Sequence, residues 1–543
     1  MTPEITTTDN KSRDSLPNWL WICLALLAIV TYFFGLTIPL LGPDEPRYAQ
    51  VAREMFERGD WITPTLGGHN WFEKPALLYW LEIASFNLFG VSEFTARLGP
   101  ALFGLGTVAA LWLLGKSIAT GVTEKSKAVF SVFSVSSEAV SFANWLALIA
   151  ASTLGILVFS RGASFDITVT FPITAALVSF FIFDDAQHKH AVAIPTSRDS
   201  DTPRRAVLPL ILFYFFVGVA LLAKGLIGIV FPYAIIAVYY LLSRRMPSRQ
   251  FVVSVIWGTL FAFAVAAIWY LPMYLRHDWE FVDEFFLQHH FQRFTSNKYK
   301  HPQPFYFFFW VLPLMTLPWL PFFLAAVWKV GKRIFHHRAT EITENDENES
   351  IRLTFSVSPL LLFSISWLAV PLIFFSLSGS KLPGYILPAV PPAIIITTLF
   401  ISELVVKRVW RYCIVGIATA TFVTTISLLA TVVPKFAGYD SVKLLIVKGD
   451  ERGFVSSKVL TMHTISHNAE FYAAGRLLRE ENGKQKKLYG PGEIQQVIAD
   501  QGGKPVLVLV PLEYLHQLTS ATQLKAEYLK DNGELAIVAV SAK

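Results

Sequence analysis

Long apolar segments, separated by short polar loops, recur along the chain. Eleven of them are apolar enough to cross a bilayer core of about 30 Å, which takes about 17–25 helical residues. They lie at 19–41, 97–119, 139–160, 167–183, 207–223, 226–242, 251–275, 306–328, 353–377, 385–402 and 412–433. A further apolar stretch, 76–90, is too short to cross alone. The pattern predicts a mainly α fold, a polytopic bundle of membrane helices. Residues 127–160 could hold either one span or three.

Composition agrees with a membrane protein. Of 543 residues, 53% are hydrophobic and only 16% are charged, whereas about a quarter are charged in ordinary globular domains. Cys23 and Cys413 both lie in apolar segments, so we expect neither a disulfide framework nor a cysteine metal site. The polar first fifteen residues have no cleavage signal, and we expect the first span to be retained.

Basic residues mark one face of the bundle. Every second loop collects Lys and Arg, at 11–13, 116–127, 189–205, 244–249, 329–338 and 407–411. Short cytoplasmic loops carry this excess, so the pattern places the N-terminus in the cytoplasm. The opposite face then carries the loops 42–96, 161–166, 276–305 and 378–384, together with the chain after residue 433.

The last 110 or so residues have ordinary polarity and differ from the rest. KPVLVLVP (504–511) and ELAIVAV (534–540) are typical of strands, and HNAEFYAAGRLL (467–478) and GEIQQVIADQ (492–501) of helices. We therefore expect two domains: a transmembrane domain over 1–433 and a small soluble α/β domain over 434–543, outside the cytoplasm.

The stretch GPDEPRYAQ (42–50) follows the first span directly. Its apolar positions, which continue through Met55, recur at helical spacing and predict an amphipathic helix that lies on lipid or on the bundle. Asp44 is suited to be its N-cap and Gly59 to end it. On this structural interpretation, Asp44 and Glu45 only complement the helix dipole. The residues of the segment alone do not decide between that role and a chemical one.

Other charged motifs on the same face favour chemistry. They are WFEKP with Glu73 and Lys74, SRGASFD with Arg161 and Asp166, and LLAKGLIG with Lys224. A single lysine at the end of a span is commonly an interfacial anchor. Several carboxylates and cations together suit glycosyl transfer from a lipid phosphate, because the sugar gains positive charge while the departing phosphate gains negative charge. A carrier would need polar sites at mid-membrane depth instead.

The motifs in combination resemble a known superfamily. They are DEPRYA (44–49), FEKP (72–75), the lone Asp166, AKG (223–225), HHFQRF (289–294) with PFYFFFWVLP (304–313), and SKLPGYILP (380–388). The chain resembles, over essentially its full length, the GT-C superfamily of polyprenyl-phosphate-dependent glycosyltransferases. It is most similar to the bacterial aminoarabinose transferases that modify lipid A.

The resemblance implies the GT-C fold with about thirteen spans and a periplasmic active site in the inner membrane of a Gram-negative bacterium. It implies transfer of 4-amino-4-deoxy-L-arabinose from undecaprenyl phosphate to a lipid A phosphate, and hence resistance to polymyxin and cationic peptides. Catalytic carboxylates would be Asp44, Glu73 and Asp166. Residues that bind the donor phosphate or close the cavity would be Arg47, Tyr48, Lys74, Lys224, His290, Arg293 and Tyr385. No cofactor is certain from the sequence, a divalent metal stays open, and we expect no nucleic-acid partner.

Several alternatives stay open from the sequence. A lipid A phosphate is largely ionised near neutral pH and needs no base, so Asp44 would position groups there, whereas a hydroxyl acceptor would make Asp44 a general base. One alternative is a transferase of the same superfamily with another sugar or acceptor, such as a protein O-mannosyltransferase. Only the motifs that are less widely shared in the superfamily, EKP, AKG, HxxRF and KLPxY, argue against it. A carrier for lipid-linked sugars, or a purely structural role for the outer charges, are the remaining alternatives.

Overall fold

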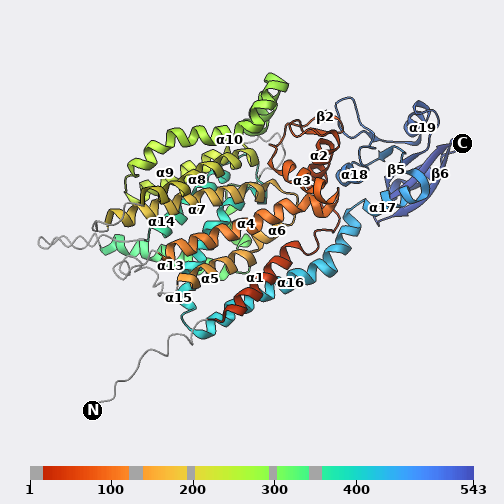
Figure 1. The fold of residues 1–543 in the computed structure, drawn as a ribbon. Coiled ribbons are helices and arrows are strands. Elements are labelled where there is room, and N and C mark those ends of the chain that lie inside the picture. Colours follow the sequence, from red (N-terminus) through yellow and green to blue (C-terminus); the bar gives the residue numbers. More distant parts are fainter. Residues whose placement is uncertain (1–15, 121–138, 193–201, 293–302, 341–357) are drawn as a thin grey trace, which may run out of the picture.

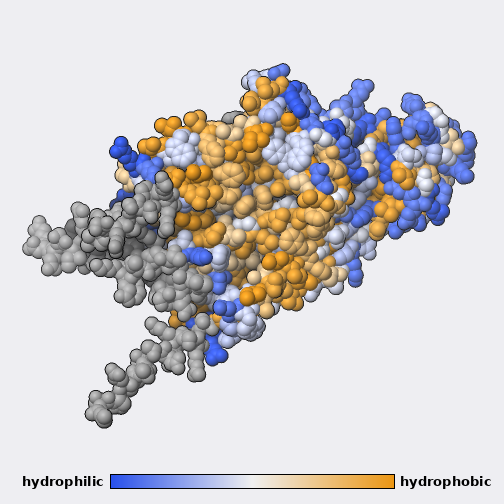
Figure 2. Space-filling model, in the orientation of Figure 1, coloured by the Kyte–Doolittle hydropathy of each residue, from blue (hydrophilic) through white to orange (hydrophobic). Residues whose placement is uncertain are grey.

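The computed structural model describes residues 16–120, 139–192, 202–292, 303–340 and 358–543, apart from some side chains at the margins of these ranges. Most of the described chain forms long, roughly parallel helices that lie side by side (Figure 1). The start of α1 and the C-terminal domain lie towards opposite ends of this bundle. A broad hydrophobic surface covers its side, and hydrophilic residues gather towards the C-terminal domain (Figure 2).

The bundle consists of helices of very different length. They are α1 (Asn18–Phe33), α4 (Glu93–Thr120), α5 (Ala139–Ser152), α6 (Leu154–Phe159), α7 (Phe165–Val192), α8 (Thr202–Lys224), α9 (Ile227–Ser243), α10 (Arg249–Val282), α12 (Phe307–Met315), α13 (Leu320–Thr340), α14 (Pro359–Leu377), α15 (Val390–Leu404) and α16 (Arg408–Asp440). Among the described residues, seven helices are long and apolar enough to cross a membrane alone. The prediction of a polytopic helical bundle is confirmed.

Two predicted spans are broken in the structure. The segment 139–160 forms α5 and α6, which meet at Thr153, and 306–328 forms α12 and the start of α13. Residues 121–138, where further spans were left open, lie outside the described part of the chain. Leu77–Phe89 forms α3, the short apolar helix expected not to cross alone.

The predicted amphipathic helix is α2 (Asp44–Arg58), and Gly59 ends it in the left-handed conformation (φ 66°). Its apolar side packs on the protein and not on lipid, because Tyr48, Val51 and Met55 are buried against α3. The prediction that Asp44 is the N-cap is wrong, since Asp44 is the first helical residue and Pro43 precedes it. Pro46 has no N–H, so a cap at Asp44 would lack one of the donors that it normally satisfies.

The C-terminal domain has an α/β fold. Its elements are α17 (Lys443–Gly449), β3 (Val459–Met462), α18 (His467–Tyr472), β4 (Lys487–Leu488), α19 (Pro491–Asp500), β5 (Val506–Pro511), α20 (Leu515–Thr519), β6 (Leu524–Asp531) and β7 (Leu535–Ala542). The strand order is β4-β3-β5-β7-β6, with β4, β3 and β5 parallel and the β5–β7 and β7–β6 pairs antiparallel. The sheet has two apolar faces, which pack against α17 and α18 on one side and α19 and α20 on the other.

Two boundaries near this domain differ from expectation. Helix α18 ends at Tyr472 and not at Leu478, because Ala474 (φ 51°) and Gly475 (φ 79°) adopt left-handed conformations that a helix cannot continue through. Helix α16 runs through Pro434 to Asp440 without interruption. The long last helix therefore leads straight into the C-terminal domain.

Candidate active site

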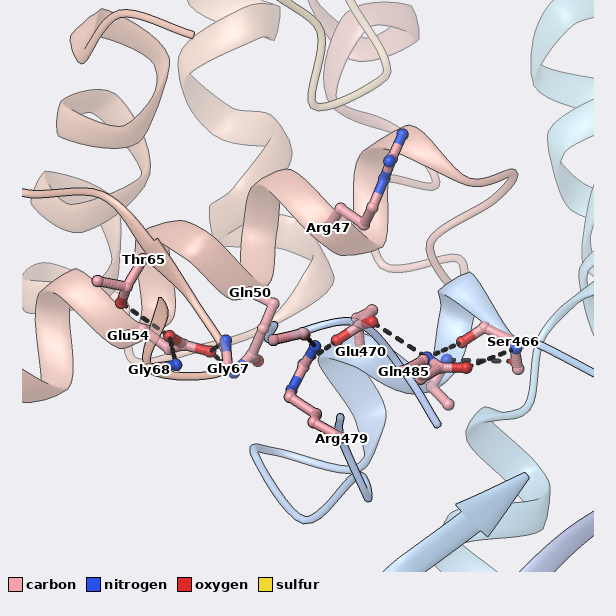
Figure 3. A network of polar contacts seen from close by, with 12 residues as sticks. Arg47, Gln50, Glu54, Thr65, Gly67, Gly68, Ser466, Glu470, Arg479 and Gln485 are labelled. Carbon is pink, nitrogen blue, oxygen red and sulfur yellow. Dashed lines mark hydrogen bonds and ion pairs between the residues drawn. The ribbon is translucent and has the colours of Figure 1, made fainter. Parts of the chain in front are cut away.

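One group of charged residues lies on α2 and on the loop that follows it. Arg47 Nη2 lies 2.5 Å from Asp44 Oδ1, and Arg47 Nε donates to the carbonyl of Pro43. Burial lowers the pKa of Arg47, but the carboxylates of Asp44 and Glu73 outweigh it, so the pKa is raised. The guanidinium therefore stays charged, and Figure 3 shows how the Arg47 side chain projects from α2.

Glu73 and Lys74 are placed by the aromatic residue before them. Phe72 is buried among Leu222 of α8 and the α10 residues Trp269 and Met273. This anchor holds the loop against the end of α8, the helix that Lys224 terminates. Lys74 Nζ lies 3.2 Å from Glu73 Oε1, and the two side chains are only 13% and 16% exposed.

A second group joins α7, α8 and the segment η3 (Pro383–Ala389). Lys224 Nζ donates to Asp166 Oδ1, and the same ammonium lies 4.9 Å from the centre of the Tyr385 ring. A Cβ atom on Gly384 would lie 1.8 Å from Asp166 Oδ2. Only glycine allows the backbone of η3 to approach the carboxylate this closely.

An aromatic contact joins the two groups. The rings of Tyr48 on α2 and Phe165, the residue before Asp166, meet edge to face with centroids 4.9 Å apart. Burial, Glu73 and Asp44 all raise the pKa of Tyr48, so its hydroxyl stays protonated. The structure thus groups Asp44, Arg47, Glu73 and Lys74 around Tyr48, on one side of this contact. On the other side lie Asp166, Lys224 and Tyr385.

Two predicted phosphate-binding residues cannot be placed. The side chain of His290 and the whole of Arg293 lie outside the described residues, although the backbone of η2 (Asp283–Gln292) is described up to Gln292. Among the side chains that are described, no group of three or more His, Cys, Asp or Glu residues is arranged to hold a metal ion.

The acid next to Asp44 has a structural role that the sequence did not reveal. Glu45 Oε2 lies 2.7 Å from Arg97 Nη2, and Glu45 also accepts from the backbone N–H groups of Ala163 and Leu41 at 2.8 and 2.9 Å. Its side chain is 15% exposed, against 53% for Asp44. Glu45 thus ties α2 to α4 and to the loop before α7. An arginine near the start of an apolar span was the only signal for its partner.

Arg161 and Lys381 are two further cations on this face that were not predicted to bind phosphate, and both donate hydrogen bonds to backbone carbonyls. Arg161 donates to the carbonyls of Thr31, Tyr32 and Phe34, where α1 ends. Lys381, in the SKLPGYILP motif, donates to the carbonyls of Ser378 and Gln303 at 2.6 and 3.1 Å and is 6% exposed. Both cations therefore fix loops at this end of the bundle.

Comparisons with known proteins agree with this fold. The family model described as dolichyl-phosphate-mannose-protein mannosyltransferase matches residues 19–285. Undecaprenyl phosphate-alpha-4-amino-4-deoxy-L-arabinose arabinosyl transferase from Aeromonas salmonicida is 29% identical over 360 residues, which is 65% of this chain and 54% of the relative. The protein of the same name from Serratia proteamaculans is 29% identical over 390 residues, 71% and 59% of the two chains. The aligned region thus spans less than two thirds of the length of these relatives.

Solved structures show the same fold. ArnT from Cupriavidus metallidurans bound to undecaprenyl phosphate superposes with a TM-score of 0.71 at 19% identity, over 97% of this chain and 98% of that one. Its apo state gives a TM-score of 0.68 at 18% identity, over 96% and 97% of the two chains. The resemblance noted from the sequence motifs is confirmed, and so is the fold it implied: a multi-pass membrane bundle with a small C-terminal α/β domain.

Proposed function

We propose that this chain is a glycosyltransferase that moves 4-amino-4-deoxy-L-arabinose from undecaprenyl phosphate to a phosphate of lipid A. One observation carries the proposal: the carboxylates of Asp44, Glu73 and Asp166 are interleaved with Arg47, Lys74 and Lys224 at one end of the bundle. The relatives named as arabinosyl transferases, and the ArnT structure with undecaprenyl phosphate, support the choice of donor.

The charges suit the two ends of the bond that breaks. Arg47, Lys74 and Lys224 would hold the lipid phosphate and stabilise the negative charge that grows as the sugar departs. The carboxylates would face the sugar, where they stabilise developing positive charge and pair with the amino group of the donor. The Tyr48 hydroxyl, which stays protonated, is a hydrogen-bond donor at the junction of the two groups.

Asp44 has a positioning role in this reaction. A phosphate monoester carries a charge of about −1.5 to −2 near neutral pH, so the acceptor attacks without losing a proton to a base. Asp44 is half exposed and already paired with Arg47, which suits it to exchange that partner for the cationic amino group of the donor. His290, Arg293 and Tyr385 would complete the enclosure of the phosphate.

The reaction would take place on the periplasmic face of the inner membrane. The described basic loops 244–249 and 407–411 lie at the end of the bundle opposite the site (Figure 1), and short loops rich in Lys and Arg stay in the cytoplasm. Modified lipid A would carry less negative charge and bind polymyxin and cationic peptides less well.

A second candidate function follows from the family match. A protein O-mannosyltransferase would use a related donor and a Ser or Thr hydroxyl, and residues 19–285 match the model of that family. In that reaction Asp44 would act as a general base, because the hydroxyl must lose its proton.

Mass spectrometry of lipid A separates these functions. Cells with and without the gene are compared, and we expect an added aminopentose only with the gene. Unmodified lipid A, together with new hexose on secreted protein, would favour the mannosyltransferase. Release of undecaprenyl phosphate from labelled donor by the purified protein distinguishes an enzyme from a carrier, which would bind the donor without turnover.

A further inference from the structure

The C-terminal domain holds the segment that leads into α2. The backbone N–H of Leu40 donates to the Tyr472 hydroxyl of α18 at 2.8 Å, and this hydroxyl donates to Glu93 at 3.1 Å. The N–H of Gly42 donates to Asp440 at 3.1 Å, at the end of α16. Asp44 therefore begins its helix directly after a segment fixed by residues from the far end of the chain.

The same domain also holds the loop that follows α2 (Figure 3). A Cβ atom on Gly67 would lie 1.9 Å from Nε of Arg479, so this guanidinium packs directly on the loop backbone. A few residues on, a Cβ atom on Gly483 would lie 2.6 Å from Cγ of His69. Two close approaches thus join the hairpin of β1 (Thr65–Leu66) and β2 (His69–Asn70) to the C-terminal domain.

Polar contacts fix both sides of this junction. Arg479 pairs with Glu470, and the two side chains are 11% and 5% exposed. Gln485 donates to Glu470 at 3.0 Å and is itself bonded to the backbone of Ser466. On the loop side, Glu54 of α2 accepts from the N–H groups of Gly67 and Gly68 at 2.7 and 3.1 Å. The contact between Arg479 and Gly67 is therefore linked to α2 through the carboxylate of Glu54.

Helix α18 also approaches the charged group itself. Arg53 of α2 donates to the carbonyl of Phe471 at 3.4 Å. His467, the first residue of α18, lies within electrostatic reach of the site: burial and Arg47 lower its pKa, while Glu470 and Asp44 act in the opposite direction. The C-terminal domain thus contacts the segment before α2, α2 itself and the loop that follows α2.

We propose that Arg479, held by Glu470 against Gly67, is a positioning residue through which the C-terminal domain fixes residues 40–74 for the transfer reaction. This inference rests on the proposed function. Packed interiors transmit small displacements instead of absorbing them, and a misplacement of about 1 Å can cost a reaction about 100-fold. Asp44, Arg47, Glu73 and Lys74 all lie on the segment that would shift.

Two neighbouring glycines give a matched test. Gly67 and Gly68 both have positive φ, 62° and 81°, so alanine strains the backbone at either position. Only at Gly67 does the new methyl group meet Arg479, whereas at Gly68 no described atom lies within 4 Å of it. In the purified full-length protein, with donor and lipid A in detergent, Gly67→Ala should lower kcat about 10- to 100-fold. Gly68→Ala should stay within about twofold of the parent, because it leaves the contact intact.

Arg479→Ala tests the same contact from the other side. It should lower kcat to a similar extent, and the double variant with Gly67→Ala should be no worse than Arg479→Ala alone, since both changes act on one contact. Hydrogen exchange of peptides from residues 40–74, measured without substrate, should become faster in Arg479→Ala and stay unchanged in Gly68→Ala.

The outcomes separate this inference from the proposed function. A parent protein that adds no sugar to lipid A overturns the function, whatever the exchange data show. A parent that transfers sugar, with Gly67→Ala and Arg479→Ala keeping its kcat, overturns the positioning role. A fall in melting temperature alone, with parental kcat and unchanged exchange of residues 40–74, would also overturn it.

Discussion

At the scale of single residues, the adjacent acids Asp44 and Glu45 have different surroundings. Asp44 is half exposed and forms an ion pair within its own helix, with Arg47 three residues further on. Glu45 is largely buried and connects α2 to Arg97 of α4 and to Ala163 before α7. The sequence showed a pair of carboxylates after a span, and the structure shows that one is exposed beside Arg47 while the other is largely buried in an ion pair with Arg97.

Asp44→Asn should abolish transfer while the protein keeps its fold. The change removes a charge with almost no change of volume, at a position whose ion pair is partly exposed and contributes about 0–1 kcal/mol. Polymyxin survival should fall to that of a strain without the gene, at equal protein in the membrane. Glu57→Gln is the matched control, because Glu57 pairs with Arg53 on the exposed side of the same helix. Normal survival of Asp44→Asn would exclude a chemical role for this carboxylate.

Glu45→Gln should instead destabilise the protein. The substitution leaves Arg97 buried without its counter-charge, which typically costs about 3–5 kcal/mol in an interior. The measurement is the thermal unfolding midpoint in detergent, compared with Asp44→Asn. Equal midpoints for the two variants would contradict the division of tasks between the neighbours.

At the scale of elements, the sequence predicted those helices and strands whose residues repeat with a regular local spacing. The amphipathic spacing of α2 and the strands β5 and β7 were found where predicted. The N-cap of α2 and the end of α18 were missed, because Pro46 and the left-handed Ala474 act through backbone geometry that periodicity does not carry. The contacts Glu45–Arg97 and Lys224–Asp166 join residues more than fifty positions apart, and the pattern along a single sequence gives no signal for such pairs.

The close approach of η3 to α7 makes Gly384 a sensitive position. In Gly384→Ala the new methyl group would overlap Asp166 Oδ2, so the carboxylate must shift, which disturbs its bond with Lys224. We expect transfer to fall by about two orders of magnitude, as for loss of one preorganised interaction. The assay uses purified donor and lipid A. Gly416→Ala, on the open surface of α16, is the control that should keep full activity. Activity near that of the parent in Gly384→Ala would show that the Asp166–Lys224 geometry is not required.

At the scale of the whole molecule, charge is segregated along the bundle. Helix α2 and the C-terminal domain share one end, while the start of α1 lies towards the other (Figure 1). Carboxylates and cations alternate at the first of these ends. The side of the bundle between these ends is broadly hydrophobic (Figure 2). A donor that carries its sugar on a long polyprenyl chain can therefore keep the chain in lipid while its phosphate reaches the charged end.

Fusions to a reporter that fluoresces only in the cytoplasm test this orientation. A fusion after Lys543 should stay dark, because the positive-inside pattern places the C-terminal domain in the periplasm. A fusion after Arg245, in the basic loop between α9 and α10, should be bright and controls for insertion and expression. Immunoblots must show equal amounts of both. A bright signal after Lys543 would put the C-terminal domain and the charged site in the cytoplasm. Lipid A would then have to be modified there, and the assignment of a periplasmic transferase would fail.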